Sequence, residues 1–321
     1  MELASAQLSA DAARDPADPD PVRHPARPVR DVLRLARPKQ WTKNVLVFVA
    51  PGAAGVLVHA RPVLQSLAIF GIFCAAASAC YFVNDTIDAE ADRAHPVKRH
   101  RPVASGQVSP KVAVALAVAL FAAALLGAVL LSGWQLLAVV GAYVAITVSY
   151  SLWLKHQPVI EISAVAAGFV LRAIAGGVAT HVPLSSWFLV VTSFSALFIV
   201  IGKRTGEHEM LGDERALHRS TLELYSPQFL RSALTLSAAG AVTTYCLWAF
   251  DKGGLSQHGS HVGHLVWIEL SVAPVITGVL YILRILDAGR GGAPSELALE
   301  DRTLQVLALI WAVLVGIGVY A

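Results

Sequence analysis

Residues 112–132 read VAVALAVALFAAALLGAVLLS, a run without a single charged side chain. An α-helix rises about 1.5 Å per residue, so this run spans roughly 30 Å, the hydrocarbon thickness of a bilayer. The whole chain has the same character, because 55% of its 321 residues are hydrophobic and only 15% are charged. A soluble domain carries about a quarter charged residues. The sequence therefore predicts an all-α membrane protein.

Further apolar segments of about 20 residues follow one another along the chain, and we expect a polytopic bundle of about nine transmembrane helices. The first segment contains Pro51 and two glycines, which leaves a broken or re-entrant segment as the alternative to a continuous helix. Connections between residues 112 and 200 are short, so adjacent helices there should be antiparallel. The predicted spans lie near 44–60, 62–84, 112–132, 134–154, 158–180, 185–202, 228–250, 264–286 and 303–321.

The first 28 residues are rich in Ala, Asp, Pro and Arg and contain no apolar run, so we predict a disordered cytoplasmic tail before one membrane domain over residues 29–321. Lys and Arg give the orientation, because cytoplasmic loops retain positive charge. With the N-terminus inside, Arg61 and Lys252 fall outside, Arg172 falls within a span, and the other 22 of the 25 are cytoplasmic. We therefore predict a multi-pass protein of the plasma (inner) membrane, whose loops after the second and sixth spans face the cytoplasm.

A cluster of carboxylates marks the end of the second span, where residues 84–92 read NDTIDAEAD. Asp85, Asp88 and Asp92 are spaced i, i+3 and i+7, which places them on one face if the helix continues. Like charges on one stripe repel each other, and a divalent cation removes that cost. Oxygen ligands suit Mg²⁺, with Mn²⁺ as the alternative ion. The competing interpretation, an acidic helix end in water, is unusual because acids at a helix C-terminus oppose the macrodipole.

A basic stretch, RAHPVKRHRP, follows immediately over residues 93–102. By itself it would be the ordinary positively charged flank of a membrane span. Beside three carboxylates it indicates a site for a metal-bound ligand with several phosphates, in which the metal bridges phosphate oxygens and the cations neutralise the rest. The candidates for phosphate contacts are Lys98, Arg99 and Arg101.

Other polar residues gather at the predicted cytoplasmic ends of the spans. Residues 202–209 read GKRTGEHE and place charges of both signs after the sixth span. Lys43 precedes the first span, where an anchor that reaches the membrane surface is the alternative to ligand binding. The remaining candidates at these ends are Lys203, Arg204 and Glu207 after the sixth span and Tyr150 and Lys155 at the end of the fourth.

Arg172 lies within the fifth predicted span, about 14 residues and so roughly 20 Å from its cytoplasmic end. An arginine inside a membrane is costly and normally faces a partner or a wet cavity. We expect Arg172 to face a substrate cavity, and a structural ion pair is the alternative. Glu161 lies on nearly the same face of this helix but too far along it for direct contact.

The remaining reactive groups indicate no further site. The histidines on the other side recur every three residues in a loop without a neighbouring carboxylate or cysteine, so we expect them to be solvated rather than to bind a metal. The three cysteines lie in apolar runs, which favours neither a disulfide framework nor a thiolate site. Nothing suggests a nucleic-acid partner, and a homo-oligomer is left open. These histidines are His258, His261 and His264.

Together these motifs resemble the UbiA superfamily of intramembrane prenyltransferases. The resemblance covers nearly the whole chain after the tail and implies a UbiA-like transmembrane catalytic domain. Within the superfamily, the chain is most similar to the branch that transfers phosphoribose to a lipid phosphate. The strings that carry the similarity are residues 37–44, 84–92, 95–99, 101–102, 150–155 and 291–296, followed by Asp301 and Arg302.

This resemblance implies an Mg²⁺-dependent transfer of 5-phosphoribose from phosphoribosyl pyrophosphate to a polyprenyl (decaprenyl) phosphate, a step toward the arabinose donor of cell-wall arabinan. Asp85, Asp88 and Asp92 would hold the metal and the leaving pyrophosphate. Lys203 and Arg204, which stand where aromatic prenyltransferases have aspartates, would bind the additional phosphate of the donor. Lys43 and Lys155 would bind the lipid phosphate, and the other substrate-binding candidates are Asn84, Tyr150, Arg172 and Glu207.

Two other functions remain as alternatives. An aromatic prenyltransferase of the same fold would use a prenyl diphosphate and would not respond to phosphoribosyl pyrophosphate. A transporter would need polar residues along a path through the membrane. Here the charges gather on one face, and only Arg172 and a few Ser and Thr side chains lie at depth, which disfavours transport.

Overall fold

The computed structural model describes residues 28–211, 221–253, 262–289, 297 and 300–321, and within these ranges every regular element is a helix. The α-helices are α2 (Pro28–Ala36), α3 (Val49–Ala53), α4 (Ala60–Ile87), α5 (Ala89–Ala94), α6 (Pro110–Leu152), α7 (Ile160–Ala179), α8 (Ser186–Leu211), α10 (Pro227–Gly253), α11 (Val262–Leu270), α12 (Val272–Asp287) and α14 (Arg302–Tyr320). The 3₁₀ helices are η1 (Pro38–Phe48), η2 (Val56–Val58), η3 (Lys98–His100), η4 (Leu154–His156) and η6 (Leu222–Leu224).

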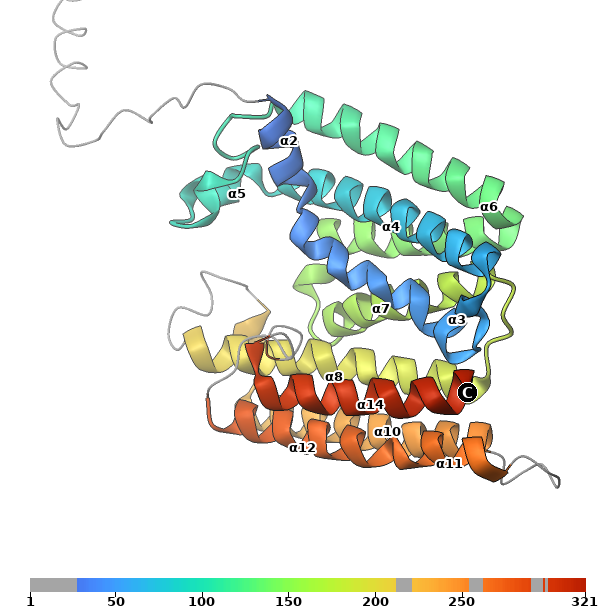
Figure 1. Cartoon of the computed structure of the whole chain (residues 1–321). Coiled ribbons are helices and arrows are strands. Elements are labelled where there is room, and N and C mark those ends of the chain that lie inside the picture. Colours follow the sequence, from blue (N-terminus) through green and yellow to red (C-terminus); the bar gives the residue numbers. More distant parts are fainter. Residues whose placement is uncertain (1–27, 212–220, 254–261, 290–296, 298–299) are drawn as a thin grey trace, which may run out of the picture.

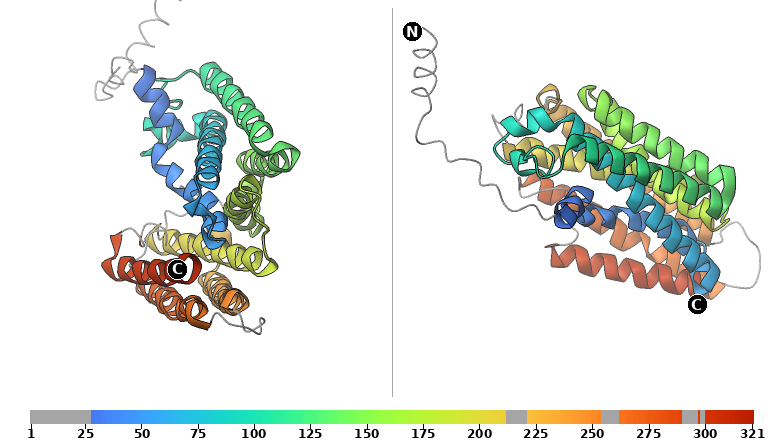
Figure 2. Two further views of the ribbon diagram at one scale, coloured as in Figure 1. Left: turned by 45° about the vertical axis from the view of Figure 1, so that its right-hand side comes forward. Right: turned by 90° about the horizontal axis from the view of Figure 1, so that it is seen from above.

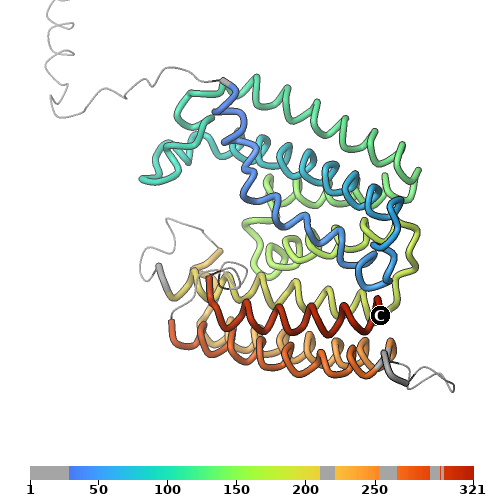
Figure 3. The backbone as a smooth tube through the Cα atoms, viewed as in Figure 1, coloured from blue at the N-terminus to red at the C-terminus, as the bar shows by residue number. Residues whose placement is uncertain are grey.

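Seven helices of the described residues are long and apolar enough to cross a membrane. One of them, α6, covers the predicted span 112–132 and most of the predicted span 134–154. Its backbone leaves the helical region at Ser132 and Gly133, which separate the two arms. Gly133 has a φ of 67°, a conformation that favours glycine. Figure 3 shows the two arms of α6 running in opposite directions from this turn. The chain is therefore an integral, multi-pass membrane protein, as predicted.

The first predicted span forms helices earlier in the chain than predicted. A continuous helical path runs through η1 and α3, from Pro38 to Ala53, rather than over residues 44–60. Proline suits the first position of a helix, because it has no amide hydrogen to leave unpaired there. Gly55, with a φ of 73°, forms the turn that follows α3. Apolar composition alone did not reveal this start, because the first turns of the pass are polar.

The helix η1 is unusual for its length. It keeps 3₁₀ geometry over 11 residues, whereas such runs rarely exceed about 3–4 residues. It passes close to α7, where a Cβ added to Gly176 would collide with the backbone carbonyl of Val47. The glycine therefore allows the two backbones to approach, and the tight packing holds η1 in place.

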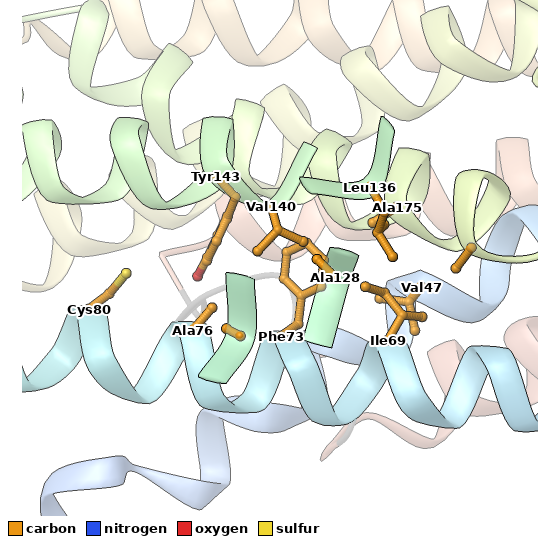
Figure 4. Packing of buried hydrophobic residues seen from close by; sticks show 12 residues of the cluster. Val47, Ile69, Phe73, Ala76, Cys80, Ala128, Leu136, Val140, Tyr143 and Ala175 are labelled. Atoms are coloured by element: carbon orange, nitrogen blue, oxygen red, sulfur yellow. The ribbon is translucent and has the colours of Figure 1, made fainter. Parts of the chain in front are cut away.

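Apolar side chains fill two halves of the bundle. Figure 4 shows the first cluster, in which Phe73 of α4 and Tyr143 of α6 lie among smaller residues such as Ala128. The second cluster includes Leu230 and Leu234 of α10 and is enclosed by α7, α8 and α12. Because lipid is as apolar as these side chains, close packing rather than water exclusion stabilises helix contacts in a membrane.

The helices lie roughly side by side, so the molecule has two ends (Figures 1 and 2). One end holds α2, α5, the start of α7 and the last turns of α8. The opposite end holds α3, the turn within α6 and the C-terminus. The residues that follow the second and sixth predicted spans therefore lie at the same end, as the distribution of Lys and Arg predicted.

Candidate active site

An ion-pair network joins the end of α4 to the residues that follow α2 and η3. The buried carboxylate of Asp85 accepts hydrogen bonds from Arg37 Nη2 at 2.6 Å and from Arg101 Nη1 at 3.3 Å. The same nitrogen of Arg101 donates to Asp92 at 2.7 Å. Arg37 has a φ of 51°, the left-handed conformation that turns the chain between α2 and η1. Two carboxylates and two arginines thus form one continuous cluster.

Asp88 belongs to a different contact. Its ψ of 1° interrupts the helix between α4 and α5. Its carboxylate accepts hydrogen bonds from Lys155 Nζ at 2.5 Å and from Asn84 Nδ2 at 3.1 Å. The three carboxylates were expected on one face only if the helix continued, and this condition is not met: Asp85 and Asp92 share a partner, whereas Asp88 is directed to the segment after α6. In the described part of the chain, no three His, Cys, Asp or Glu residues are grouped closely enough to hold a metal ion.

The pair of Asp85 and Asp92 nevertheless fits a divalent cation. Each directs one oxygen to the same nitrogen of Arg101, so a positive charge already lies between the two carboxylates. All the donor atoms are oxygens, which Mg²⁺ prefers. Asp88 can join them only if Lys155 releases it. Two of the three predicted metal ligands therefore converge, and the third lies next to them in an ion pair.

A pocket of about 350 Å³ opens beside the carboxylate of Asp85. This volume falls in the range of roughly 300–1,000 Å³ that is typical of small-molecule sites. Its lining contains four residues of fixed positive charge, one histidine and one carboxylate. Such an excess of cations suits a ligand with phosphate groups. The lining residues are Arg34, Arg37, Asp85, Val97, Lys98, His100, Arg101 and Pro102.

The pocket contains predicted and unpredicted residues. Lys98 and Arg101 line it, as their assignment to phosphate contacts requires, whereas Arg99 is exposed and lies outside the lining. Arg34 and Arg37 also line it, and neither was predicted as a site residue. The sequence contained one sign of this. Arg34 and Arg37 are three residues apart at the end of a short helix, a spacing that places both side chains on one face.

A second ion-pair network lies at the same end, between α7 and α8. Glu161 is fully buried and accepts hydrogen bonds from Nε and Nη2 of Arg204, both at 2.8 Å. Arg204 Nη1 donates to Glu207 at 2.9 Å, and Lys203 pairs with the same carboxylate at 3.7 Å. The hydroxyl of Tyr225 lies 3.5 Å from Glu161, and burial raises the pKa of Tyr225, so this hydroxyl stays protonated at neutral pH.

The contact of Arg204 with a phosphate stays a prediction, and the structure shows this residue in ion pairs. All three nitrogens of its guanidinium group donate to carboxylates, so a phosphate would have to displace at least one of these hydrogen bonds. Its partner Glu161 comes 43 residues earlier in the chain, a separation that no local motif reveals. The position of Glu161 in the first turn of a membrane helix could have indicated the pair, because a buried acid requires a cationic partner.

Arg172 is buried in the interior of the bundle. It donates from Nε to Asn44 Oδ1 at 2.8 Å, from Nη1 to the Gly168 carbonyl at 2.7 Å, and from Nη2 to the Tyr143 hydroxyl at 2.9 Å. Its guanidinium group also lies over the rings of Tyr143 and Phe73. These partners are neutral, so the ion-pair alternative is not found among the described residues. Arg172 connects α7 to η1 and α6, and its contact with substrate stays a prediction.

Lys43 and Tyr150 are partly buried, and their assignment to substrate binding stays a prediction. The predicted tail up to residue 27, the string at 291–296, and the histidines at 258 and 261 lie outside the described residues. The same holds for the side chain of His264.

Several known proteins resemble this chain over almost its whole length. The sequence profile of the UbiA prenyltransferase family matches residues 45–307. The decaprenyl-phosphate phosphoribosyltransferases of Corynebacterium glutamicum and Mycobacterium tuberculosis are each 44% identical to it, over 305 and 299 residues. These matches cover 93% and 92% of this chain and 90% and 96% of the relatives.

The helical bundle has counterparts among solved structures. A UbiA homolog from Archaeoglobus fulgidus, bound to GPP and Mg²⁺, superposes with a TM-score of 0.64 and 19% identity, over 90% of this chain and 98% of that one. At this identity the similarity concerns the fold alone. The profile match, the nearly full-length relatives and the shared bundle show that this chain belongs to the UbiA prenyltransferase family.

Proposed function

We propose that this chain transfers 5-phosphoribose from phosphoribosyl pyrophosphate to a polyprenyl phosphate, namely decaprenyl phosphate, and releases pyrophosphate. The observation that carries the proposal is the carboxylate pair of Asp85 and Asp92 beside a pocket with four fixed positive charges. A donor with a pyrophosphate and a separate phosphate ester uses both features. The names of the relatives that are 44% identical support the same activity. The product would lead to the arabinose donor of cell-wall arabinan.

The reaction depends on charge neutralisation more than on proton transfer. The bond from ribose C1 to the pyrophosphate oxygen breaks, and a bond from C1 to an oxygen of the lipid phosphate forms. That nucleophile is already anionic at neutral pH, so a general base is not required. Mg²⁺, held by Asp85 and Asp92, would stabilise the leaving pyrophosphate. Arg37 and Arg101 hold the donor in position and neutralise its remaining charge.

Lys155 is the candidate for the lipid phosphate. It lies in η4, directly after the second arm of α6, and its side chain is 18% exposed. Release of its ion pair with Asp88 would present an ammonium group to the acceptor and a carboxylate to the metal site. The isoprenoid tail would lie in the bilayer beside the bundle, with Lys43 as a second contact for the head group. The charged donor would enter from the cytoplasm.

An assay of lipid labelling tests this function. Membranes that contain the protein are incubated with Mg²⁺, decaprenyl phosphate and phosphoribosyl pyrophosphate labelled in the ribose, and a labelled lipid is expected. Membranes without the protein are the control, and Mn²⁺ in place of Mg²⁺ tests the choice of ion. Formation of product only from a prenyl diphosphate and an aromatic acceptor would establish an aromatic prenyltransferase instead.

A further inference from the structure

The pocket beside Asp85 contains more cations than the carboxylate pair uses. Arg37 and Arg101 contact Asp85 directly, so they belong to the network around the carboxylates. Arg34, from the last turn of α2, lines the pocket without an ion pair to any carboxylate of the described residues. His100, from η3, also lines it, and within the described ranges it pairs with no carboxylate. These two side chains add hydrogen-bond donors to the lining, and neither forms an ion pair with a carboxylate of the described residues.

We propose that this pocket binds the C5 phosphate of the donor, a phosphate monoester, through Arg34, Lys98 and His100. This assignment rests on the proposed function and deepens it. It separates the two phosphate groups of the donor: the pyrophosphate belongs to the carboxylate pair, and the monoester belongs to the space between α2 and η3. It also replaces the assignment of the monoester to Lys203 and Arg204 that the sequence suggested.

The charge of the pocket matches a monoester. A phosphate monoester carries a charge of about −1.5 to −2 at pH 7 and has three acceptor oxygens. Arg37 and Arg101 pair with the carboxylates of Asp85 and Asp92, and Arg34 adds a positive charge to the lining that forms no ion pair with a carboxylate of the described residues. A prenyl chain has no groups that could accept hydrogen bonds from this lining. The pocket therefore favours a phosphoribosyl donor over a prenyl donor.

The ion-pair network between α7 and α8 has no excess of positive charge. Lys203 and Arg204 are balanced by Glu161 and Glu207, so the described part of this network is neutral. The guanidinium group of Arg204 would have to leave the fully buried Glu161 in order to bind a phosphate. Leaving a buried charge without its partner is costly. The described residues thus favour the pocket beside Asp85.

Asp85 connects the two sites. It lines the pocket, and it is also one of the two carboxylates that share Arg101. One donor molecule can therefore place its monoester in the pocket while its pyrophosphate lies at the carboxylates. Binding at both ends would fix ribose C1 between them, which is the positioning that transfer to the lipid phosphate requires.

The experiment combines pocket variants with a shortened donor, ribose 1-pyrophosphate, which lacks the C5 phosphate. Arg34→Gln should raise the KM for phosphoribosyl pyrophosphate about ten- to a hundredfold, the usual effect of losing a charge-assisted contact. Its effect on the shortened donor should stay within about twofold, because the partner of Arg34 is then absent. Arg34→Lys keeps the charge and should restore most of the lost affinity. His100→Gln should show the same dependence on donor, with a smaller change.

The matched control is Lys111→Gln, an exposed cation at the start of α6 outside the pocket, which should leave the KM for both donors unchanged. Equal losses with both donors in Arg34→Gln would overturn the assignment. So would a donor-dependent loss in Lys203→Gln together with a normal KM in Arg34→Gln. Failure of the unaltered protein to use either donor would instead overturn the proposed function, and this assignment with it.

Discussion

The guanidinium group of Arg101 lies between the carboxylates of Asp85 and Asp92, and it allows both acids to stay charged close to each other. Asp85 and Asp92 would repel each other in a buried site, and the shared nitrogen removes that repulsion. The i, i+7 spacing of the two acids predicted their proximity. The spacing could not predict that Arg101 lies between the two acids, because Arg101 belongs to the segment after η3 and contacts α4 and α5 from there.

Neutral amides at the three acidic positions should separate their roles. Asn keeps the size of Asp and removes its charge, so Asp85→Asn and Asp92→Asn should each lower turnover at least about a hundredfold through loss of metal binding. Asp88→Asn should lower it less, by about tenfold, because the Asp88 carboxylate is directed to Lys155. The labelled-lipid assay measures each variant, and gel filtration in detergent checks its folding.

Chelation supplies the control for this ranking. EDTA should abolish activity, and added Mg²⁺ should restore it. Equal losses at all three positions would show that Asp88 also binds the metal in the working enzyme. Activity that persists in EDTA would remove the metal from the reaction.

The buried pair of Glu161 and Arg204 should matter for stability rather than for phosphate binding. Glu161→Gln leaves a buried guanidinium group with Glu207 as its remaining acidic partner. Removing one partner of a buried ion pair typically costs about 3–5 kcal/mol, so the apparent Tm in detergent should fall clearly. The double variant Glu161→Leu with Arg204→Met removes both charges and should recover most of the loss. A double variant as unstable as Glu161→Gln would contradict this.

Among the elements, the connection between α6 and α7 stands out for its backbone. Val159 has a φ of 66° and a ψ of −46°, and the Ile160 amide donates to the Pro158 carbonyl at 2.7 Å, which is a γ-turn with positive φ. A β-branched residue rarely adopts this conformation, and such strain costs about 1–3 kcal/mol. The Val159 amide donates to the Tyr225 hydroxyl at 2.8 Å, so a contact from the segment before α10 stabilises the turn.

Two substitutions at this position test the strain. Val159→Gly should be at least as stable as the unaltered protein, and Val159→Ala should be less stable than Val159→Gly by about 1 kcal/mol, because Ala keeps the Cβ that disfavours positive φ. The apparent Tm in detergent measures both. At Val114, exposed in α6, the order should reverse, because Gly is worse than Ala in a helix by about 1 kcal/mol. The same order at both positions would show that the turn is unstrained.

The membrane-spanning elements could largely be predicted, because length and apolar composition are local properties of a sequence. The turn at Gly133 lies where the prediction separates two spans. The first pass was misplaced, because its polar residues face inward: Asn44 is buried and accepts a hydrogen bond from Arg172. The 3₁₀ geometry of η1 and the interruption at Asp88 could not be predicted either, since both depend on contacts with distant elements.

In the whole molecule, both ion-pair networks lie at one end of the bundle, the end that holds α2 and α5 in Figure 1. Local patterns predicted that the two charged segments lie at the same end, because the number of predicted spans between them is even. They could not predict which cations stay with acids inside the protein and which line the pocket. That division depends on pairs far apart in the chain, such as Lys155 with Asp88, which are 67 positions apart.

The orientation of this end can be tested with single cysteines. In a background without Cys74, Cys80 and Cys246, the variants Ser105→Cys and Glu223→Cys place a thiol at exposed positions of the end that holds both networks. Arg61→Cys and Lys252→Cys do the same at the opposite end. An impermeant thiol reagent is applied to intact cells, and permeabilised cells show that all four thiols can react.

We expect labelling at 61 and 252 and protection at 105 and 223, because Lys and Arg concentrate in cytoplasmic loops. A highly charged donor does not cross a bilayer. With this orientation, phosphoribosyl pyrophosphate must therefore reach the site from the cytoplasm. The opposite pattern would place the site outside and would exclude a cytoplasmic donor. Labelling at only one of positions 105 and 223 would contradict the arrangement of the helices, because the two charged segments would then lie on opposite sides of the membrane. Agreement at all four positions would place Lys155, the proposed contact for the lipid phosphate, on the cytoplasmic side of the membrane.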